Sequence, residues 1–307
     1  MPFVTTDDGV RLYYEEAGTG TPLIFVHEFA GDHRSWEPQI RFFARRYRCI
    51  AYSARGYTPS DVPPPGSDYS QERVWLDLRC LMDGLNIAQA HLVGLSMGGF
   101  ACLHFGLHHG TQGTASRALS LTLAGCGTGS HPAVYEGFKA QSKVLADEIQ
   151  TLGAQHLANT YGMGPSRLQF KAKDPRGYAE FNARLAEHSA LGSALTSRGY
   201  QGERPSLYAL TEQIAHINVP TLIMTGDEDE PCLEPSLLLK RTIDTASQQV
   251  QSIAAESQRA QEELARLSDA AAQGGLQDAL AVKMEREQQL GAKRSAYDDL
   301  TAKLRAS

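Results

Sequence analysis

The five residues Gly94-Leu95-Ser96-Met97-Gly98 place a nucleophile between small neighbours at fixed spacing. A glycine stands two positions before Ser96 and another stands two positions after it, which is the G-x-S-x-G pattern. This pattern is typical of a sharp strand-to-helix turn, where a strained serine backbone holds its hydroxyl clear of the chain. The strand and the helix pass so closely that only glycine fits at both flanking positions. Ser96 is therefore the candidate nucleophile.

The segments on either side of this motif are suited to build such a turn. The apolar residues 90–93 are too few for a helix and predict a buried strand, whereas residues 99–107 are apolar, rich in small side chains and predict a buried helix. The N–H of Met97 would then lie at the helix N-terminus, where an unpaired donor and the helix dipole can hold an oxyanion. The alternative is a glycine-rich helix entry with an incidental serine, and the surrounding pattern favours the turn.

Strands and helices alternate through the first 130 residues. Residues 10–16 alternate in polarity and predict an early antiparallel strand. Continuous apolar runs predict strands that are buried on both faces, at residues 23–26, 47–52 and 118–124. Helical periodicity is found over residues 35–45, with Ser35 as N-cap, and over residues 70–85. This order predicts a mostly parallel sheet with helices on both faces.

The pattern changes between residues 131 and 217. Helices are expected at about 132–160, 176–189 and 206–215, separated by segments that contain glycine and proline. Residues 220–225 return to the pattern of a buried strand. The helical stretch therefore interrupts the sheet, and the simplest interpretation is a lid.

Composition excludes several classes of function. The net charge is −6 and no basic run occurs, which argues against a nucleic-acid surface. The five cysteines form no C-x-x-C pair, so buried free thiols in a reducing compartment are expected. Neither a signal peptide nor a stretch long enough to span a membrane is found, which favours a cytoplasmic protein with a small-molecule substrate. His108 and His109 lack further ligands at metal-binding spacing, and no cofactor is indicated.

Four motifs follow one another in a characteristic order: a turn at His27, the loop at Arg55-Gly56, the turn at Ser96 and Gly226-x-x-Asp229. On these motifs, residues 10 to about 243 resemble the α/β-hydrolase superfamily. The resemblance implies an eight-stranded, mostly parallel sheet with a helical lid between the sixth and seventh strands. It also implies that the Arg55 loop is structural, although Ser53 and Thr58 depart from the family's usual Asp and Gly.

The resemblance assigns roles to individual residues. Ser96 would be the nucleophile, Asp229 would be the acid that orients a histidine, and Asp227 would be the fallback for that acid. The backbone N–H groups of Phe29 and Met97 would form the oxyanion hole. His27 is expected to be a buried histidine that stabilises its turn, and Glu28 stands where the family usually has glycine.

The family's base is missing from its expected place. In this family the order is serine, acid and then histidine, but no histidine follows Asp229. Residues 245–307 are instead rich in Ala, Gln, Glu and Arg, contain no proline and carry apolar residues at helical spacing, which predicts a helical hairpin or a coiled-coil-like arm. Disorder in isolation is the alternative. Without a final strand, the strand at 221–225 becomes an edge. Four earlier histidines could substitute for this base: His131, His156 and His188 in the insertion, and the less favourable His216.

These observations divide the chain into a first part of the core at 1–130, a helical lid at 131–217, a second part of the core at 218–244 and a tail at 245–307. The function implied is a serine hydrolase that cleaves an ester or related acyl bond of a small apolar substrate through an acyl-serine. Members of this family include esterases, lactonases, carbon–carbon bond hydrolases and cofactor-free haloperoxidases. The alternatives are a catalytically impaired or non-catalytic protein that binds a ligand or assembles through its tail, and a hybrid reading frame that begins near residue 244.

Overall fold

The computed structural model describes residues 2–110 and 116–243, together with a few isolated positions between 258 and 295. The chain divides into two compact units, residues 1–243 and 244–307. The described positions of the second unit are helical and exposed, and the Gln258 amide donates to Glu262 at 3.3 Å. The rest of the hairpin or coiled-coil-like arm expected for residues 245–307 lies outside the described residues.

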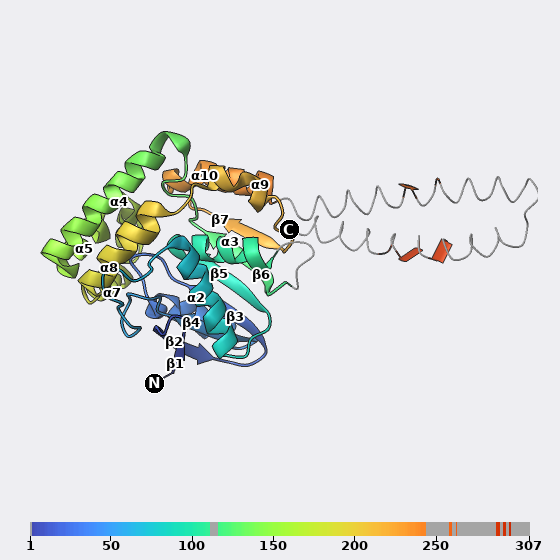
Figure 1. Cartoon of the computed structure of the whole chain (residues 1–307), viewed down its shortest axis with the longest axis horizontal. Coiled ribbons are helices and arrows are strands. Elements are labelled where there is room, and N and C mark those ends of the chain that lie inside the picture. The colour runs from blue at the N-terminus through green and yellow to red at the C-terminus, as the bar shows by residue number, and fades with distance from the viewer. Residues whose placement is uncertain are drawn as a thin grey trace, which may run out of the picture. The chain divides into compact units, whose positions relative to one another are not determined.

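The first unit is built on a sheet whose described strands number seven, in the order β1-β2-β4-β3-β5-β6-β7 (Figure 1). The strands β1 and β2 pair antiparallel, β2 also pairs antiparallel with β4, and all later pairs are parallel. The bounds are β1 (Phe3–Thr5), β2 (Arg11–Ala17), β3 (Thr21–Val26), β4 (Tyr47–Tyr52), β5 (Ala90–Leu95), β6 (Ala118–Ala124) and β7 (Thr221–Met224). The mostly parallel sheet expected from the sequence is confirmed.

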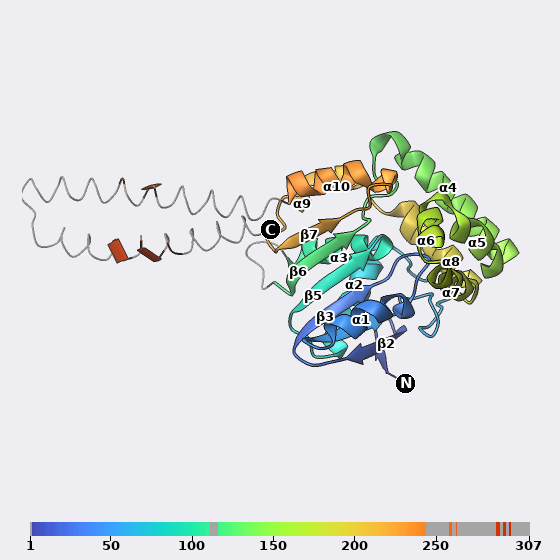
Figure 2. The same ribbon diagram turned by 180° about the vertical axis from the view of Figure 1, so that it is seen from behind.

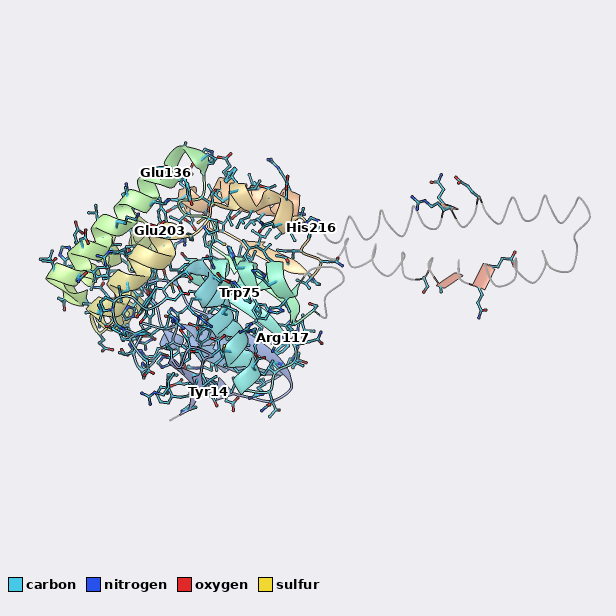
Figure 3. All side chains as sticks on the ribbon, viewed as in Figure 1. Tyr14, Trp75, Arg117, Glu136, Glu203 and His216 are labelled. Atoms are coloured by element: carbon cyan, nitrogen blue, oxygen red, sulfur yellow. The ribbon has the colours of Figure 1, made fainter. Side chains whose placement is uncertain are left out.

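One face of the sheet packs on α2 (Gln71–Gly84) and α3 (Met97–His109). The Ser70 hydroxyl caps α2 by accepting from the N–H of Arg73 at 3.1 Å, and most of α3 is buried, as its apolar composition predicts. Trp75 of α2, labelled in Figure 3, stacks on His108 of α3 with 4.1 Å between ring centroids. This layer fixes the first turn of α3 beneath the candidate site.

The opposite face is covered unevenly. The helix α1 (Glu37–Phe43) packs against β4, and Phe25 of β3 is buried near it. Phe25 pairs with Val93 of β5, Val93 with Thr122 of β6, and Thr122 with Leu222 of β7. Leu222 is 56% exposed. Seen from behind, no described helix lies in front of β6 and β7 (Figure 2). The strand β7 is the edge of the described sheet, as the sequence predicts.

A long helical insertion, residues 131–217, joins β6 to β7. Its elements are α4 (Pro132–Leu152), α5 (Ala154–Thr160), η2 (Tyr161–Met163), η3 (Pro165–Arg167), α6 (Leu168–Lys173), α7 (Pro175–Ala186), α8 (Ala190–Leu195), the π-helical turn η4 (Thr196–Gln201), η5 (Leu207–Leu210) and α9 (Thr211–Ile214). After β7, the chain ends its first unit with α10 (Glu230–Thr242).

Three local expectations were wrong. The helix expected at 132–160 is two helices, because Gly153 adopts a φ of +83° between α4 and α5. The helices α6 and α8 were not expected, since neither shows a long periodic pattern. Ser35 is not the N-cap of α1: Asp32 caps the preceding turn η1 (His33–Trp36), and the Ser35 hydroxyl accepts from the N–H of Asp32 at 3.2 Å.

Candidate active site

The backbone at Ser96 has the strained conformation expected of the turn. Its φ is 51° and its ψ is −111°, values that a residue with a side chain adopts only under constraint. A Cβ added to Gly94 would lie 2.1 Å from the carbonyl oxygen of Gly98. A Cβ added to Gly98 would lie 2.1 Å from the carbonyl oxygen of Val26. Both glycines are therefore required by backbone contacts, and the strand β5 and helix α3 together hold Ser96 in place.

The side chain of Ser96 remains available. Its backbone is fixed on both sides, because its N–H donates to the carbonyl of Ala124 at 2.7 Å and its carbonyl accepts from Phe100 at 3.1 Å. The residue is half-buried, and within the described ranges no side chain hydrogen-bonds its hydroxyl. A serine in this position can attack a substrate, but no described base is in place to take its proton.

His27 stabilises the turn after β3, as expected. It is fully buried, with Nδ1 donating to the carbonyl of Glu28 at 2.7 Å and Nε2 accepting from the N–H of Ala54 at 3.0 Å. This pair of partners selects the neutral ring with its proton on Nδ1. Burial lowers the pKa of His27 to about 4, which agrees with a neutral side chain. His27 therefore ties the loop of residues 27–32 to the β4 loop and is not positioned as a base.

The two proposed oxyanion donors are held by their carbonyl groups. The Tyr57 hydroxyl donates to the carbonyl of Phe29 at 3.0 Å, and the Tyr200 hydroxyl donates to the carbonyl of Met97 at 2.6 Å. The Phe29 ring packs edge-on against Tyr161 at 5.5 Å. Neither the Phe29 N–H nor the Met97 N–H bonds to another described residue. Within the described ranges, both backbone donors are therefore without a partner.

Glu28 finds a partner in the insertion. Its carboxylate forms an ion pair with the guanidinium of Arg167, which also lies 4.9 Å over the Phe181 ring. Both charged side chains are largely buried, and the pairing raises the pKa of Arg167 despite the opposing effect of desolvation. The residue that replaces the family's usual glycine thus fastens the loop of residues 27–32 to the insertion, while the loop keeps its backbone turn.

Asp229 follows β7 and Ser96 follows β5, so both lie at the carboxyl ends of the parallel strands. Asp229 precedes α10, and its carboxylate sits beside Gly125, where an added Cβ would be 3.3 Å from Oδ2. Gly125 follows Ala124, the residue that binds the backbone of Ser96. Both residues therefore lie next to the end of β6, and no hydrogen bond among the described residues joins their side chains. Asp227, the fallback acid, is exposed.

The four histidines that could substitute for the base make their described contacts with residues other than Ser96. His131 lies 3.3 Å from Glu234, and His156 lies 3.7 Å from Glu148. His188 is buried and neither of its ring nitrogens makes a hydrogen bond to a described residue, although Nε2 lies 3.8 Å from Asp32 and the ring packs against Tyr57 at 5.3 Å. His216 is at the end of the insertion, where its Nδ1 donates to the carbonyl of Glu212 at 2.7 Å. Among the described residues, none of these contacts brings an imidazole to Ser96.

One charged residue beside the site gave no signal in the sequence. Arg204 is buried, and its guanidinium lies 3.8 Å over the ring of Phe100, one helical turn beyond Ser96. No motif surrounds it, so only the fold brings it to this place.

Within the described ranges, no group of three or more His, Cys, Asp or Glu side chains could hold a metal ion. No described helix is long and apolar enough to cross a membrane.

Comparison with known proteins identifies the family. The family model for the alpha/beta hydrolase fold matches residues 21–234, and the chain belongs to this family. It is 28% identical to the AB hydrolase superfamily protein YisY of Bacillus subtilis over 74% of this chain and 81% of that protein. It is also 28% identical to 3-oxoadipate enol-lactonase 1 of Acinetobacter baylyi, over 67% of this chain and 71% of that protein.

The fold has a counterpart among solved structures. The enol-lactonase from Burkholderia xenovorans superposes with a TM-score of 0.66 at 22% identity, covering 80% of this chain and 88% of that chain.

A separate likeness concerns a short stretch: 69 residues, 22% of this chain, are 72% identical to the chromosome partition protein Smc of Delftia acidovorans. This chain spans only 6% of the length of that protein.

Proposed function

We propose that this α/β hydrolase cleaves an ester or related acyl bond of a small, largely apolar substrate, with Ser96 as nucleophile. The strained backbone of Ser96 between two obligatory glycines is the observation that carries the proposal. The free N–H groups of Phe29 and Met97 support it, and so do relatives whose names include an enol-lactonase and haloperoxidases. Five buried free cysteines support action in a reducing compartment such as the cytoplasm.

In the proposed reaction, the Ser96 Oγ bonds to the acyl carbon while the Phe29 and Met97 amides hold the oxyanion. The C–O bond to the alcohol breaks, and the proton lost by the Ser96 hydroxyl reaches the leaving alkoxide through solvent. Water then attacks the acyl-serine, so that the acid leaves and the Ser96 hydroxyl is restored. Residues 131–217 would act as the lid, since Tyr161 and Tyr200 contact the residues that supply both amides. Asp229 would orient a histidine, but no described histidine stands there. We therefore expect acylation to be slower than in a complete triad by about a thousandfold or more.

A serine-directed fluorophosphonate tests this proposal. The full chain and the Ser96→Ala variant are labelled in parallel, and hydrolysis of short p-nitrophenyl esters is measured on the same samples. Labelling that depends on Ser96, at a slow rate, is the expected result. Labelling of both proteins alike, or ester turnover that the Ser96→Ala variant retains, would refute the proposal.

A second candidate function rests on the likeness to Smc. The 69 matched residues are close in number to the 63 residues of the segment 245–307, and the hydrolase match ends at residue 234. We infer that the match falls largely on this segment and that the segment self-associates as a coiled-coil-like arm. Analytical ultracentrifugation of the full chain should then show a dimer, which a Leu290→Pro variant dissociates. A monomer at all concentrations would exclude this role.

The junction itself can be observed directly. If a hybrid reading frame produces this chain, trypsin releases the single peptide Thr242–Arg259, which contains hydrolase and tail residues together. Mass spectrometry of cells that carry the coding sequence detects this peptide only if the composite chain is translated. Translation of the other frames beyond residue 244 is the complementary check, because it would expose a displaced histidine loop.

A further inference from the structure

Arg204 is a buried cation beside the candidate nucleophile. It lies between η4 and η5 in the insertion and is 3% exposed. One terminal nitrogen donates to the carbonyl of Thr128 at 2.6 Å, and the other donates to the side chain of Gln201. Its guanidinium lies over the rings of Phe100 at 3.8 Å and Phe138 at 5.0 Å. Of its five N–H donors, these partners leave some without an acceptor.

No described carboxylate balances this charge. The neighbouring acid, Glu203, turns the other way and pairs with Lys143 at 2.7 Å and Lys139 at 3.9 Å; it is labelled on the insertion in Figure 3. Arg167, the other largely buried arginine of the insertion, has the carboxylate of Glu28. Taking an ion out of water costs several kcal/mol unless a counter-charge is present, so buried charges are usually paired. Arg204 is buried without such a counter-charge among the described residues.

The surroundings of Arg204 are those of the site itself. Phe100 belongs to the first turn of α3 and donates its N–H to the carbonyl of Ser96. Tyr200, one turn before Arg204, binds the carbonyl of Met97 through its hydroxyl. Thr128 lies in the loop that follows β6, three residues beyond Gly125 and its contact with Asp229. Arg204 is therefore surrounded by residues that contact the backbone of Ser96 and Met97, and by the loop next to Asp229.

We propose that Arg204 binds a carboxylate carried by the substrate, so that the preferred substrate is an otherwise apolar ester or lactone with one acidic group. This inference rests on the proposed function of Ser96. The planar guanidinium can present two parallel donors to a carboxylate, and a bidentate bond of that kind is strong in a buried place. The substrate then supplies the counter-charge that no described residue provides, and Arg204 selects acids over neutral esters.

The test measures binding, without turnover, on the full chain with Ser96→Ala. Isothermal titration compares the monomethyl esters of succinate, adipate and suberate with the corresponding dimethyl esters, which lack the charge. We expect at least one monoacid to bind about 30-fold more tightly than its neutral twin. Adding Arg204→Gln should abolish this preference. Adding Arg198→Gln, which removes a charge from the exposed part of η4, should leave it unchanged.

If Arg204→Gln does not fold, Arg204→Met keeps the volume and removes the charge, an exchange that buried ions often tolerate. Absence of any preference for the monoacids in the Ser96→Ala protein would overturn the proposal. So would a preference that survives Arg204→Gln or Arg204→Met in a folded protein, because Arg204 would then serve packing alone. The two proposals can fail separately. If the Ser96→Ala protein prefers the monoacids but the parent protein is not labelled by fluorophosphonate, the carboxylate site is supported and the hydrolytic function is refuted.

Discussion

The two ends of the sheet differ in completeness. Around β3 and β5, each element has its partners: His27 bridges two loops, two tyrosines hold the carbonyls of the proposed oxyanion donors, and helices cover the strands. Around β7, the described strand has no outer neighbour, and Leu222 and Met224 are 56% and 50% exposed. No described histidine contacts Asp229 there. Among the described residues, the part of the sheet proposed to bind and orient the substrate therefore has all its contacts, whereas the part proposed to move the proton lacks a base.

This difference separates two tasks that a serine hydrolase performs together. Holding the acyl group and its oxyanion depends on backbone geometry near Ser96, which tolerates no side chain at the flanking glycines. Proton transfer depends on a side chain supplied by a later segment. Holding the acyl group and its oxyanion can survive a change in the chain beyond β7, because the contacts that support it are all made within residues 23–204. Changes around β3 and β5 should consequently be costly, and changes around β7 should be mild.

The largest effect is expected at Gly98. In Gly98→Ala, the new Cβ would meet the backbone of Val26 at 2.1 Å, which neither strand nor helix can avoid. We expect a loss of roughly 3 kcal/mol in the free energy of unfolding and no fluorophosphonate labelling. Urea denaturation and labelling measure both. The matched control is Gly137→Ala in the exposed part of α4, where nothing lies within 4 Å and a gain of roughly 0.5–1 kcal/mol is expected.

The next effect concerns pH and His27. Its pKa is about 4 in the folded protein against 6.5 when exposed, so between these values the unfolded chain binds more protons. This contribution to stability is complete above pH 6.5 and is lost as the pH falls toward 4, by about 3 kcal/mol at most. Denaturation at pH 7.5 and pH 4.5 should show a smaller difference for His27→Gln than for the parent. An equal difference would assign the pH dependence to other groups, such as His104.

A smaller effect is expected for Asp229→Asn. In a complete triad, the same change removes about 10⁴-fold in rate, because the histidine loses its orientation. Here the carboxylate orients no described histidine, so the rate of fluorophosphonate labelling should change by less than about threefold. A drop of a hundredfold or more would show that a base does reach Asp229, and the comparison between the two ends of the sheet would fail.

The smallest effect is expected on the exposed face of β7. Leu222→Ser should change the free energy of unfolding by about 0.5 kcal/mol or less, since the side chain is already more than half exposed. Leu123→Ala in the neighbouring strand is the reference, because Leu123 is fully buried and its truncation should cost about 2–5 kcal/mol. If Leu222→Ser is as damaging as the reference, something covers this face in solution.

Much of the fold could be predicted from the sequence because its signals are local. Continuous apolar runs identified the buried strands, and the spacing of glycines around Ser96 identified the turn, since both are dictated by the immediate backbone. The absence of a histidine after Asp229 is equally a property of the sequence. The break at Gly153 and the helices α6 and α8 were missed, because they depend on packing among short segments that carry no periodic pattern.

The sequence by itself determined the family, the candidate nucleophile and acid, and the missing base, because each follows from residue type and order. Only the tertiary structure decided which distant groups meet. Arg167 pairs with Glu28 across 139 positions of the chain, the Tyr200 hydroxyl binds the carbonyl of Met97, and Arg204 lies over Phe100 with no acid among the described residues to pair with it. Such contacts depend on how the insertion folds over the sheet. Because burial removes a charged side chain from water at a cost in free energy, a buried arginine needs a counter-charge that an exposed one does not.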